Sequence, residues 1–366
     1  MGLKKAVLTC LLQVCNFFFR MCSIKQNRIT FISLTADHLE QDFLEIDKLL
    51  REDNKYDLHY NLIVFKKTLK DDFMYMLNCI RQLYEINVSK LIILNDNNFV
   101  VSTFKREGTY VLQTWHACGA IKKFGNQIER QYPVRNYDGV LANSTYWKDA
   151  YHEAFGVKQE QVIITGMPRV DKLCDEEIVS SYKERFYEKY PQYRDQYKVL
   201  YAPTFRGNII KGLRYDDLDL ASVMFQLPSD YVMFYKMHPL LADASLKEGE
   251  RIVNVSHEDL YMLLCACDCL ITDYSSILFD YSLLGKKAIC YASDYEDYQQ
   301  TIGFNVQYQK EMPSKICTNE QELIEQLSEC SFDEGKMKKF QEMFMPFDDG
   351  GNAKRVYAHI QKVMNS

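Results

Sequence analysis

The chain has 366 residues, a length that suits two domains of ordinary size better than a single core. Its composition, 47% hydrophobic and 26% charged, is typical of a globular protein and argues against a disordered or membrane-embedded chain. The net charge of −6 comes without a long basic patch, so we expect no nucleic-acid partner.

The first segment is apolar and is flanked by basic residues. Lys4 and Lys5 precede the apolar run 6–19, and Arg20 and Lys25 follow it. The run is shorter than the roughly 20 residues that a spanning helix needs. Two interpretations stay open: a helix in the interface of an anionic bilayer, which would attach residues 1–25 peripherally to a membrane, and a helix packed on the first domain.

Strand and helix patterns then alternate along the first half of the chain. The predicted strands are 29–34, 58–65, 90–94, 110–115 and 139–142. The predicted helices are 37–50, 71–84 and a segment capped by Ser144 that runs to about residue 155. This alternation indicates a parallel sheet with helices on both faces.

The second half repeats the pattern. We interpret the charged, tyrosine-rich stretch 182–197 as a hinge region, after which strands are predicted at 198–202, 231–237, 269–272 and 288–291. The tail from Glu334 is helical, with a loop at 346–351. We therefore expect an α/β protein with two Rossmann-like domains, 1–190 and 191–345, whose ligands lie at the carboxyl ends of the strands.

The 12 cysteines have no repeating spacing, and we interpret them as reduced thiols. Cys265, Cys267 and Cys269 alternate along an apolar run, so a strand would carry all three on one face. Such a strand does not supply the converging ligands that zinc needs, and we expect buried packing there instead of a metal.

Reactive side chains follow the predicted strand ends at five places. At the first, His116 follows the strand 110–115 and precedes small residues, with Lys122 and Lys123 shortly after. A histidine at such a turn is placed for proton transfer, and the small residues let backbone approach a phosphate closely. A structural role is the alternative for a lone histidine.

Three further turns carry polar residues. In segment 166–171, glycine and proline shape a turn that presents Arg169, whose planar fork suits phosphate oxygens; pairing with Asp171 is the alternative. Segment 201–207 is again a strand that enters a polar turn. Lys236 and His238 leave a strand together. Each of the last two is equally well explained as an ordinary surface turn.

The fifth place is the start of a predicted helix after the strand 269–272. Ser275 and Ser276 supply two hydroxyls there, and the exposed N–H groups and the helix dipole favour an anion. Asp280 lies four residues after Ser276, on the same helical face. Helix capping by Asp273 or Ser275 is the alternative, and it is compatible with phosphate binding.

In their order, these stretches resemble the CDP-glycerol glycerophosphotransferase family, the teichoic-acid primases and polymerases of Gram-positive bacteria. The resemblance spans about residues 112–298 and includes Asn143 and Ser144. It implies a GT-B-like fold in which two Rossmann-like domains face a central cleft. The first domain would be the acceptor side and the second would bind the CDP donor, while a C-terminal helix within 346–366 crosses back to the first domain.

The resemblance also implies roles for individual residues. It makes His116 and His238 catalytic, and it implies donor contacts from Arg169, Pro203, Thr204, Lys236, Ser275, Ser276 and Asp280. Two departures bear on the substrate. The family usually shows His-Gly-Thr-Pro at the segment 116–119, which here begins His116-Ala117, and it often has an arginine near Lys236. These two departures leave the identity of the polyol and of the acceptor undetermined.

The implied reaction transfers glycerol phosphate, or ribitol phosphate, from a CDP-activated donor to a hydroxyl of a lipid-linked wall polymer and releases CMP. Fixed cations would offset the phosphate charge, so we expect no tightly bound metal or cofactor, with Mg²⁺ at most loosely bound. The enzyme would lie peripherally on the cytoplasmic face of the plasma membrane, and its short N-terminal segment favours a primase or short-chain transferase. The alternatives are a GT-B glycosyltransferase that uses a nucleotide sugar and an inactive membrane-attached scaffold.

Overall fold

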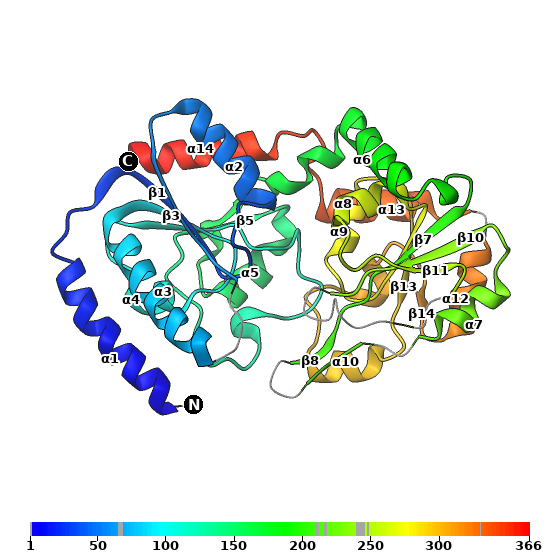
Figure 1. Ribbon diagram of the computed structural model, residues 1–366, viewed down its shortest axis with the longest axis horizontal. Helices are drawn as coiled ribbons and strands as arrows, with labels where there is room; N and C mark the ends of the chain where they lie inside the picture. Colours follow the sequence, from blue (N-terminus) through cyan, green and yellow to red (C-terminus); the bar gives the residue numbers. More distant parts are fainter. Residues whose placement is uncertain are drawn as a thin grey trace. The chain divides into compact units, whose positions relative to one another are not determined.

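The computed structural model describes residues 2–64, 69–208, 212–215, 218–238, 246, 249–329 and 331–366. The chain divides into two compact units, which are coloured by sequence in Figure 1. The first unit comprises residues 1–118, 124–171 and 351–366. The second unit comprises residues 119–123 and 172–350.

The first unit is built on a parallel sheet of six strands in the order β2-β1-β3-β4-β5-β6. The strands are β1 (Lys25–Ser33), β2 (Asp57–Leu62), β3 (Ser89–Leu94), β4 (Tyr110–Gln113), β5 (Gly139–Ala142) and β6 (Val162–Ile164). Ile29, Ile92 and Leu112 on the inner strands are fully buried. Continuous apolar runs of this kind are typical of parallel strands that are covered on both faces.

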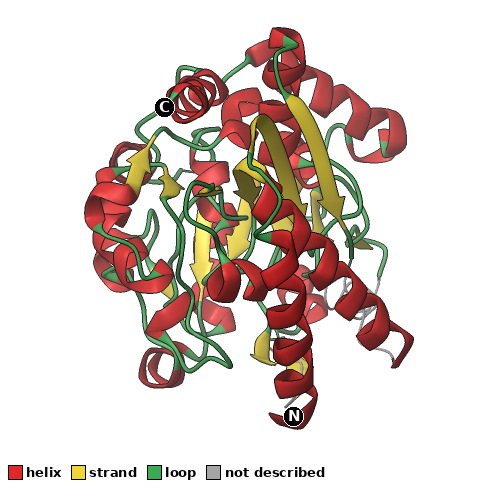
Figure 2. Ribbon diagram, turned by 90° about the vertical axis from the view of Figure 1, so that its left-hand side faces the viewer, coloured by secondary structure: helices red, strands yellow, loops and turns green. Residues whose placement is uncertain are grey.

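Helices flank this sheet, as Figure 2 shows. They are α1 (Gly2–Phe19), α2 (Gln41–Asp53), α3 (Leu69–Val88), α4 (Phe99–Phe104), α5 (Lys148–Phe155) and α14 (Asn352–Asn365). The N-terminal α1 lies along α3 at the edge of the unit, and the C-terminal α14 packs against α2 (Figure 1). The last helix of the chain is therefore part of the first unit.

The second unit contains another parallel six-stranded sheet, with the order β11-β10-β7-β12-β13-β14. Its strands are β7 (Tyr197–Tyr201), β10 (Tyr231–Tyr235), β11 (Ile252–Asn254), β12 (Cys269–Thr272), β13 (Lys287–Tyr291) and β14 (Ile316–Cys317). A separate antiparallel hairpin is formed by β8 (Arg206–Asn208) and β9 (Gly212–Arg214).

The helices of the second unit include two pairs that pack on each other, α6 with α8 and α9 with α13. Their bounds are α6 (Glu176–Lys189), α7 (Leu220–Gln226), α8 (Leu260–Ala266), α9 (Ile277–Ser282), α10 (Tyr295–Thr301), α11 (Tyr308–Glu311), α12 (Glu320–Ser328) and α13 (Glu334–Phe344). The two units have a common α/β architecture built on a parallel sheet, as predicted, and each sheet has six strands.

The strand orders locate the preferred ligand-binding edge of each sheet. If the six strands of the second sheet are numbered in chain order, their order across the sheet is 3-2-1-4-5-6. The direction in which successive strands are added therefore reverses between β7 and β12. In the first unit it reverses between β1 and β3. Ligands of open α/β sheets bind outside the carboxyl ends of the strands at such reversal points. A ligand of the second unit is therefore expected beside the segments that follow β7 and β12.

Two local predictions were wrong. The stretch 182–197, predicted as a hinge, contains most of α6, because Asp175 caps that helix and Phe186 buries its ring in the core of the second unit. The boundary between the units accordingly lies near residue 172, ahead of the predicted 190.

The second error concerns the three closely spaced cysteines. They do not share a strand, because Asp259 accepts a hydrogen bond from the Met262 amide and starts helix α8, which includes Cys265. Cys267 follows α8, and Cys269 begins β12. All three thiols are nevertheless buried as expected, and desolvation raises the pKa of Cys267 and of Cys269 to about 12.

Candidate active site

His116 lies on a tightly held loop directly after β4 in the first unit. The Thr114 hydroxyl donates to the Leu94 carbonyl at 3.0 Å, and the Trp115 amide donates to the Gln113 side chain at 2.8 Å. Trp115 adopts the left-handed backbone region, with φ of 62°, which turns the chain sharply. The exposed imidazole of His116 follows, and its ring lies 3.9 Å from the Trp115 ring.

The imidazole is oriented by the neighbouring strand. Nδ1 of His116 lies 3.2 Å from the carbonyl oxygen of Asn95, which directly follows β3. Because a carbonyl oxygen only accepts, this hydrogen bond requires the proton on Nδ1. The neutral ring then carries its lone pair on Nε2, the arrangement that a general base needs.

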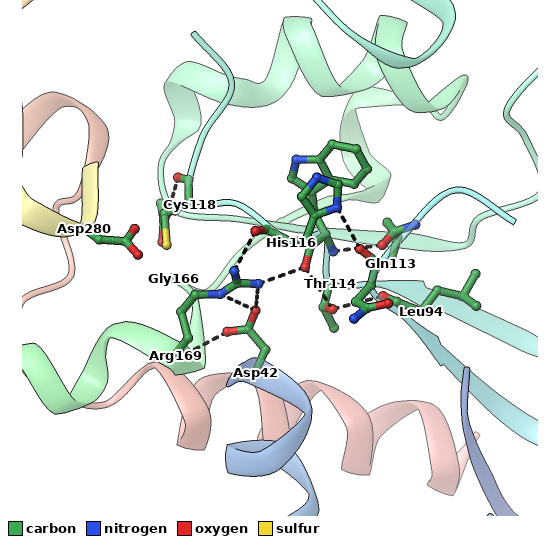
Figure 3. A network of polar contacts seen from close by, with 12 residues as sticks. Asp42, Leu94, Gln113, Thr114, His116, Cys118, Gly166, Arg169 and Asp280 are labelled. Carbon is green, nitrogen blue, oxygen red and sulfur yellow. Dashed lines mark hydrogen bonds and ion pairs between the residues drawn. The ribbon is translucent and has the colours of Figure 1, made fainter. Parts of the chain in front are cut away.

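Arg169 holds this loop from below, as Figure 3 shows. Its Nη1 donates to the His116 carbonyl at 2.7 Å and its Nη2 donates to the Trp115 carbonyl at 3.0 Å. Its Nε and Nη2 bind the carboxylate of Asp42 on α2, and its backbone amide donates to the same carboxylate at 2.8 Å. Arg169 and Asp42 are only 4% and 1% exposed. The structure thus gives Arg169 a positioning role for the His116 loop, and its predicted donor contact stays a prediction.

The rest of the segment 166–171 anchors the C-terminal helix. Asp171 accepts hydrogen bonds from the amides of Asn352 and Ala353, at 3.0 and 2.8 Å, and so caps the start of α14. Gly166 has φ of +76°, and a Cβ atom there would come within 1.9 Å of Asn352. Asp171 therefore pairs with helix amides and Arg169 pairs with Asp42, so the alternative of an Arg169–Asp171 pair is wrong.

In the second unit, Asp273 joins the loops that follow β7 and β12. Its carboxylate accepts from the Thr204 amide and hydroxyl, both at 2.9 Å, and from the Tyr274 amide at 2.6 Å. Arg206 donates to the same carboxylate at 2.8 Å. These loops lie at the reversal point of the sheet, so Pro203 and Thr204 stand at the edge where a ligand is expected.

Arg206 is itself enclosed. Its Nε and Nη2 donate to Asp294 at 2.6 and 2.9 Å, and its guanidinium lies over the rings of Tyr274 and Tyr298. The neighbouring carboxylates raise the pKa of Arg206 although desolvation opposes them, and the guanidinium in turn lowers the pKa of Asp294. Two carboxylates therefore neutralise the Arg206 guanidinium, and its role is to hold these loops in place.

Lys236 and His238 follow β10, the strand next to β7. The Lys236 ammonium donates to the carbonyls of Ser256 and Glu258, at 2.9 and 2.7 Å, and burial lowers its pKa. Lys236 thus fixes the loop after β11. The His238 ring, which is partly exposed, packs edge-on against Phe205 with a centroid distance of 4.7 Å. Residue 239, the proline that directly follows His238 in the sequence, lies outside the described residues.

The serines and Asp280 have different environments. Ser275 and Ser276 are partly exposed just before the six-residue helix α9, and Ser275 Oγ accepts from the Ile277 amide at a long 3.4 Å. Asp280 is buried, and it accepts from the Tyr261 hydroxyl at 3.1 Å. The hydroxyls are accessible to a ligand, whereas Asp280 belongs to the interior of the unit.

The structure brings the predicted loops of the second unit together, but the residues that support the loops were not predicted. Thr204, His238 and the two serines follow three adjacent strands, β7, β10 and β12, at one edge of the second sheet. Asp42, Asp294 and the framework role of Arg206 were not predicted, because each acts on residues more than 60 positions away in the chain. Within the described residues, no group of three histidine, cysteine or acidic side chains is arranged to hold a metal ion.

Comparison with known proteins agrees with this architecture. A family model described as CDP-Glycerol:Poly(glycerophosphate) glycerophosphotransferase matches residues 14–362. The teichoic acid poly(ribitol-phosphate) polymerase of Bacillus spizizenii is 30% identical over 93% of this chain, which spans 57% of that relative's length. The teichoic acid glycerol-phosphate primase of Bacillus subtilis is 30% identical over 79% of this chain and 78% of the relative.

A solved structure of the wall teichoic acid polymerase TagF has a similar fold. It superposes with a TM-score of 0.75 at 20% identity and covers 99% of this chain and 95% of that chain. The α/β, GT-B-like fold that was predicted is thereby confirmed. With the family model matching nearly the whole sequence, the chain belongs to the CDP-glycerol:poly(glycerophosphate) glycerophosphotransferase family, the transferases of teichoic acid synthesis.

Proposed function

We propose that this enzyme transfers a polyol phosphate, glycerol phosphate foremost, from a CDP-polyol to a hydroxyl of a lipid-linked polymer and releases CMP. The observation that carries the proposal is the imidazole of His116. It is exposed, its Nδ1 proton is committed to the Asn95 carbonyl, and its loop is fixed by a buried arginine. A base so prepared suits the removal of a proton from a hydroxyl nucleophile.

In the proposed reaction, an oxygen of the acceptor hydroxyl attacks the phosphorus that bears the polyol. Nε2 of His116 takes the hydroxyl proton as the new O–P bond forms. The bond from that phosphorus to the bridging oxygen of the pyrophosphate breaks in line, and CMP leaves with the electron pair. Such a displacement needs positive charge and hydrogen-bond donors around the pyrophosphate more than covalent chemistry.

The second unit supplies groups of that kind. His238 and the hydroxyls of Ser275 and Ser276 follow strand ends at the reversal point of the sheet, on either side of the Thr204 loop, whose own hydroxyl donates to Asp273. Arg206 and Lys236 are committed to carboxylates and carbonyls, so we assign them to the support of these loops. We expect turnover to need no tightly bound metal, and it should therefore survive dialysis against EDTA.

The proposal that the acceptor is lipid-linked and is met at a membrane surface draws on helices α1 and α3. Helix α1 packs on α3 through the fully buried Leu12 and an edge-on contact of Phe19 with Tyr84. It leaves Phe17 and Phe18 exposed by 70% and 59%. One helix thus packs on the first unit and still presents apolar rings outward, which supports the proposal of membrane attachment. Among the described helices, none has the length and apolarity needed to cross a bilayer.

Exposed apolar residues also lie on α3, at Phe73 and Met74, which are 58% and 59% exposed. Arg20 and Lys25 are exposed nearby in the chain, whereas the Lys5 ammonium donates to the Gln131 carbonyl at 2.6 Å. Aromatic and basic side chains of this kind favour adsorption to the headgroup region of an anionic membrane. We propose peripheral attachment to the cytoplasmic leaflet, where a lipid-linked acceptor would be presented.

A donor panel tests the proposal. CMP release should be measured with CDP-glycerol, CDP-ribitol and UDP-sugars on a lipid-linked acceptor, with product lengths resolved. Release from a CDP-polyol alone supports the assignment, and the two polyols are compared because the relatives include both a glycerol-phosphate and a ribitol-phosphate enzyme. Turnover only with UDP-sugars would identify a glycosyltransferase, and no turnover with any donor would favour the scaffold hypothesis.

A further inference from the structure

Lys122 lies on a short backbone bridge within the second unit. It pairs with Phe304 in an isolated antiparallel bridge. On either side, the Asn305 amide donates to the Ile121 carbonyl at 2.8 Å and the Lys123 amide donates to the Gly303 carbonyl at 3.0 Å. The side chain of Asn305 donates to the Lys122 carbonyl at 3.2 Å. The Lys122 backbone is therefore fixed to the second unit, only six residues after His116.

The Lys122 ammonium contrasts with the other buried ammonium groups of this unit. Lys236, Lys286 and Lys287 each donate to at least two backbone carbonyls, and Lys198 donates to one carbonyl and pairs with Asp268. Among the described residues, the Lys122 ammonium has neither a hydrogen-bond acceptor nor an ion-pair partner. The ammonium lies over the ring of Phe205, whose centroid is 5.5 Å from Nζ.

Partial burial without a partner is unfavourable for a cation. Desolvation lowers the pKa of Lys122, with Arg206 acting in the same direction and Asp273 opposing them. Asp273 is already engaged by Arg206 and by the Thr204 loop, so it does not pair with Lys122. A desolvated ammonium of this kind gains much when an anion binds beside it.

The surroundings favour a phosphate as that anion. The Phe205 ring that contacts Lys122 also contacts the His238 ring, at a centroid distance of 4.7 Å. Phe205 directly follows Thr204, at the reversal point of the sheet where a ligand of the second unit is expected. Lysine binds phosphate as a compact point charge, which suits the several oxygens of a pyrophosphate.

We propose that Lys122 binds a phosphate of the nucleotide donor and that Phe205 places Lys122 and His238 around it. This assignment rests on the proposed function for the identity of the donor. It gives the segment after His116 a second role, because the same stretch of chain that carries the base continues into a residue that holds the donor phosphate.

The test is the binding of CDP, measured by calorimetry, to the Lys122→Met variant. Loss of one charge-assisted contact should weaken CDP binding about 10- to 100-fold. Lys122→Arg retains the charge and should stay within about fivefold of the unmodified chain. The matched control is Lys123→Met, which removes the same charge from an exposed neighbour and should leave the affinity unchanged.

A melting curve without ligand separates binding from folding. If Lys122 binds an anion, Lys122→Met should melt at the same temperature as the unmodified chain or higher, because it removes an unpaired, desolvated charge. CDP affinity within twofold of the unmodified chain would overturn the assignment. Should the unmodified chain bind UDP and not CDP, the donor proposal fails, and the same variants titrated with UDP then decide on Lys122.

Discussion

Each of the two units holds its reactive loops with a buried arginine–aspartate ion pair. In the first unit the arginine of the pair binds the loop, and in the second unit the aspartate does. In the first unit, Asp42 anchors Arg169, whose remaining donors hold the carbonyls of the His116 loop. In the second unit, Arg206 anchors Asp273, whose remaining acceptor sites hold the amides of the Thr204 and Tyr274 loops. One loop is held by its carbonyls and the other two by their amides.

The difference matters for what each loop presents. The first unit displays an imidazole whose hydrogen-bonded Nδ1 leaves Nε2 as the base. The second displays hydroxyls, His238 and Lys122 at the end of its sheet. We therefore expect substitutions in the first unit to change the rate of transfer, and substitutions in the second to change the affinity for the donor.

His116→Ala should have the largest effect on transfer. Loss of a general base typically lowers the rate about 10²- to 10⁴-fold, while donor affinity should stay unchanged. Turnover at saturating CDP-polyol measures the rate. His38→Ala, an exposed histidine paired with Asp37 in the same unit, is the control and should retain full activity. A rate loss below about threefold in a stably folded His116→Ala protein would remove this residue from the chemistry.

Asp42→Asn tests the buried support of the His116 loop. It leaves the Arg169 charge buried without a counter-charge, and breaking such a pair lowers the free energy of unfolding by about 3–5 kcal/mol. Denaturant unfolding measures this loss. Glu184→Gln, in the exposed pair with Arg194, should cost less than about 1 kcal/mol. Equal, small losses in both variants would show that Asp42 does not support the loop.

The fold was more predictable than these supports. The strands β5 and β12 coincide with the predicted ranges because fully buried parallel strands are continuous apolar runs. The stretch containing α6 was misjudged because its face toward the core is narrow, with Phe186 as its one buried residue. Its cap, Asp175, was a local signal that could have corrected the error.

The position of the candidate site could be predicted from the sequence, but the partners of its residues could not. Polar residues after strands mark the ligand edge of an α/β sheet, so local sequence predicted the turns that carry His116, Thr204 and the serines, while the family resemblance implied their roles. Arg169 was expected to face a phosphate, because nothing near it in the sequence points to Asp42, 127 residues earlier. Long-range pairs of this kind are set by tertiary packing, which local patterns do not encode.

Ser275→Ala combined with Ser276→Ala tests the contribution of the second unit to donor binding. Hydrogen bonds from hydroxyls to charged groups contribute about 1.5–3 kcal/mol each, so the double variant should bind CDP-glycerol at least about tenfold more weakly. Calorimetry measures the affinity, with Ser180→Ala plus Ser181→Ala on exposed positions of α6 as the control. Unchanged affinity in the Ser275 and Ser276 double variant would leave these serines only a part in the helix start.

Arg20→Gln should have the smallest effect, on membrane attachment. A basic residue near an anionic surface contributes on the order of 1 kcal/mol, so partitioning to anionic vesicles should fall about fivefold. Vesicle flotation measures it, and neutral vesicles should show no difference. Lys354→Gln on α14 removes an equal charge elsewhere in the first unit and is the control. Equal losses in both variants would point to net charge and not to the N-terminal segment.

The division of labour between the units is tested most directly by measuring two quantities in the same two variants. These are the donor dissociation constant, from calorimetry, and the single-turnover rate at saturating donor, from rapid quench. We predict that His116→Ala loses at least about 100-fold in rate with its donor affinity within twofold. The Ser275 and Ser276 double variant should lose affinity at least about tenfold and change its saturating rate much less. Loss of donor affinity in His116→Ala with a normal saturating rate would contradict the account.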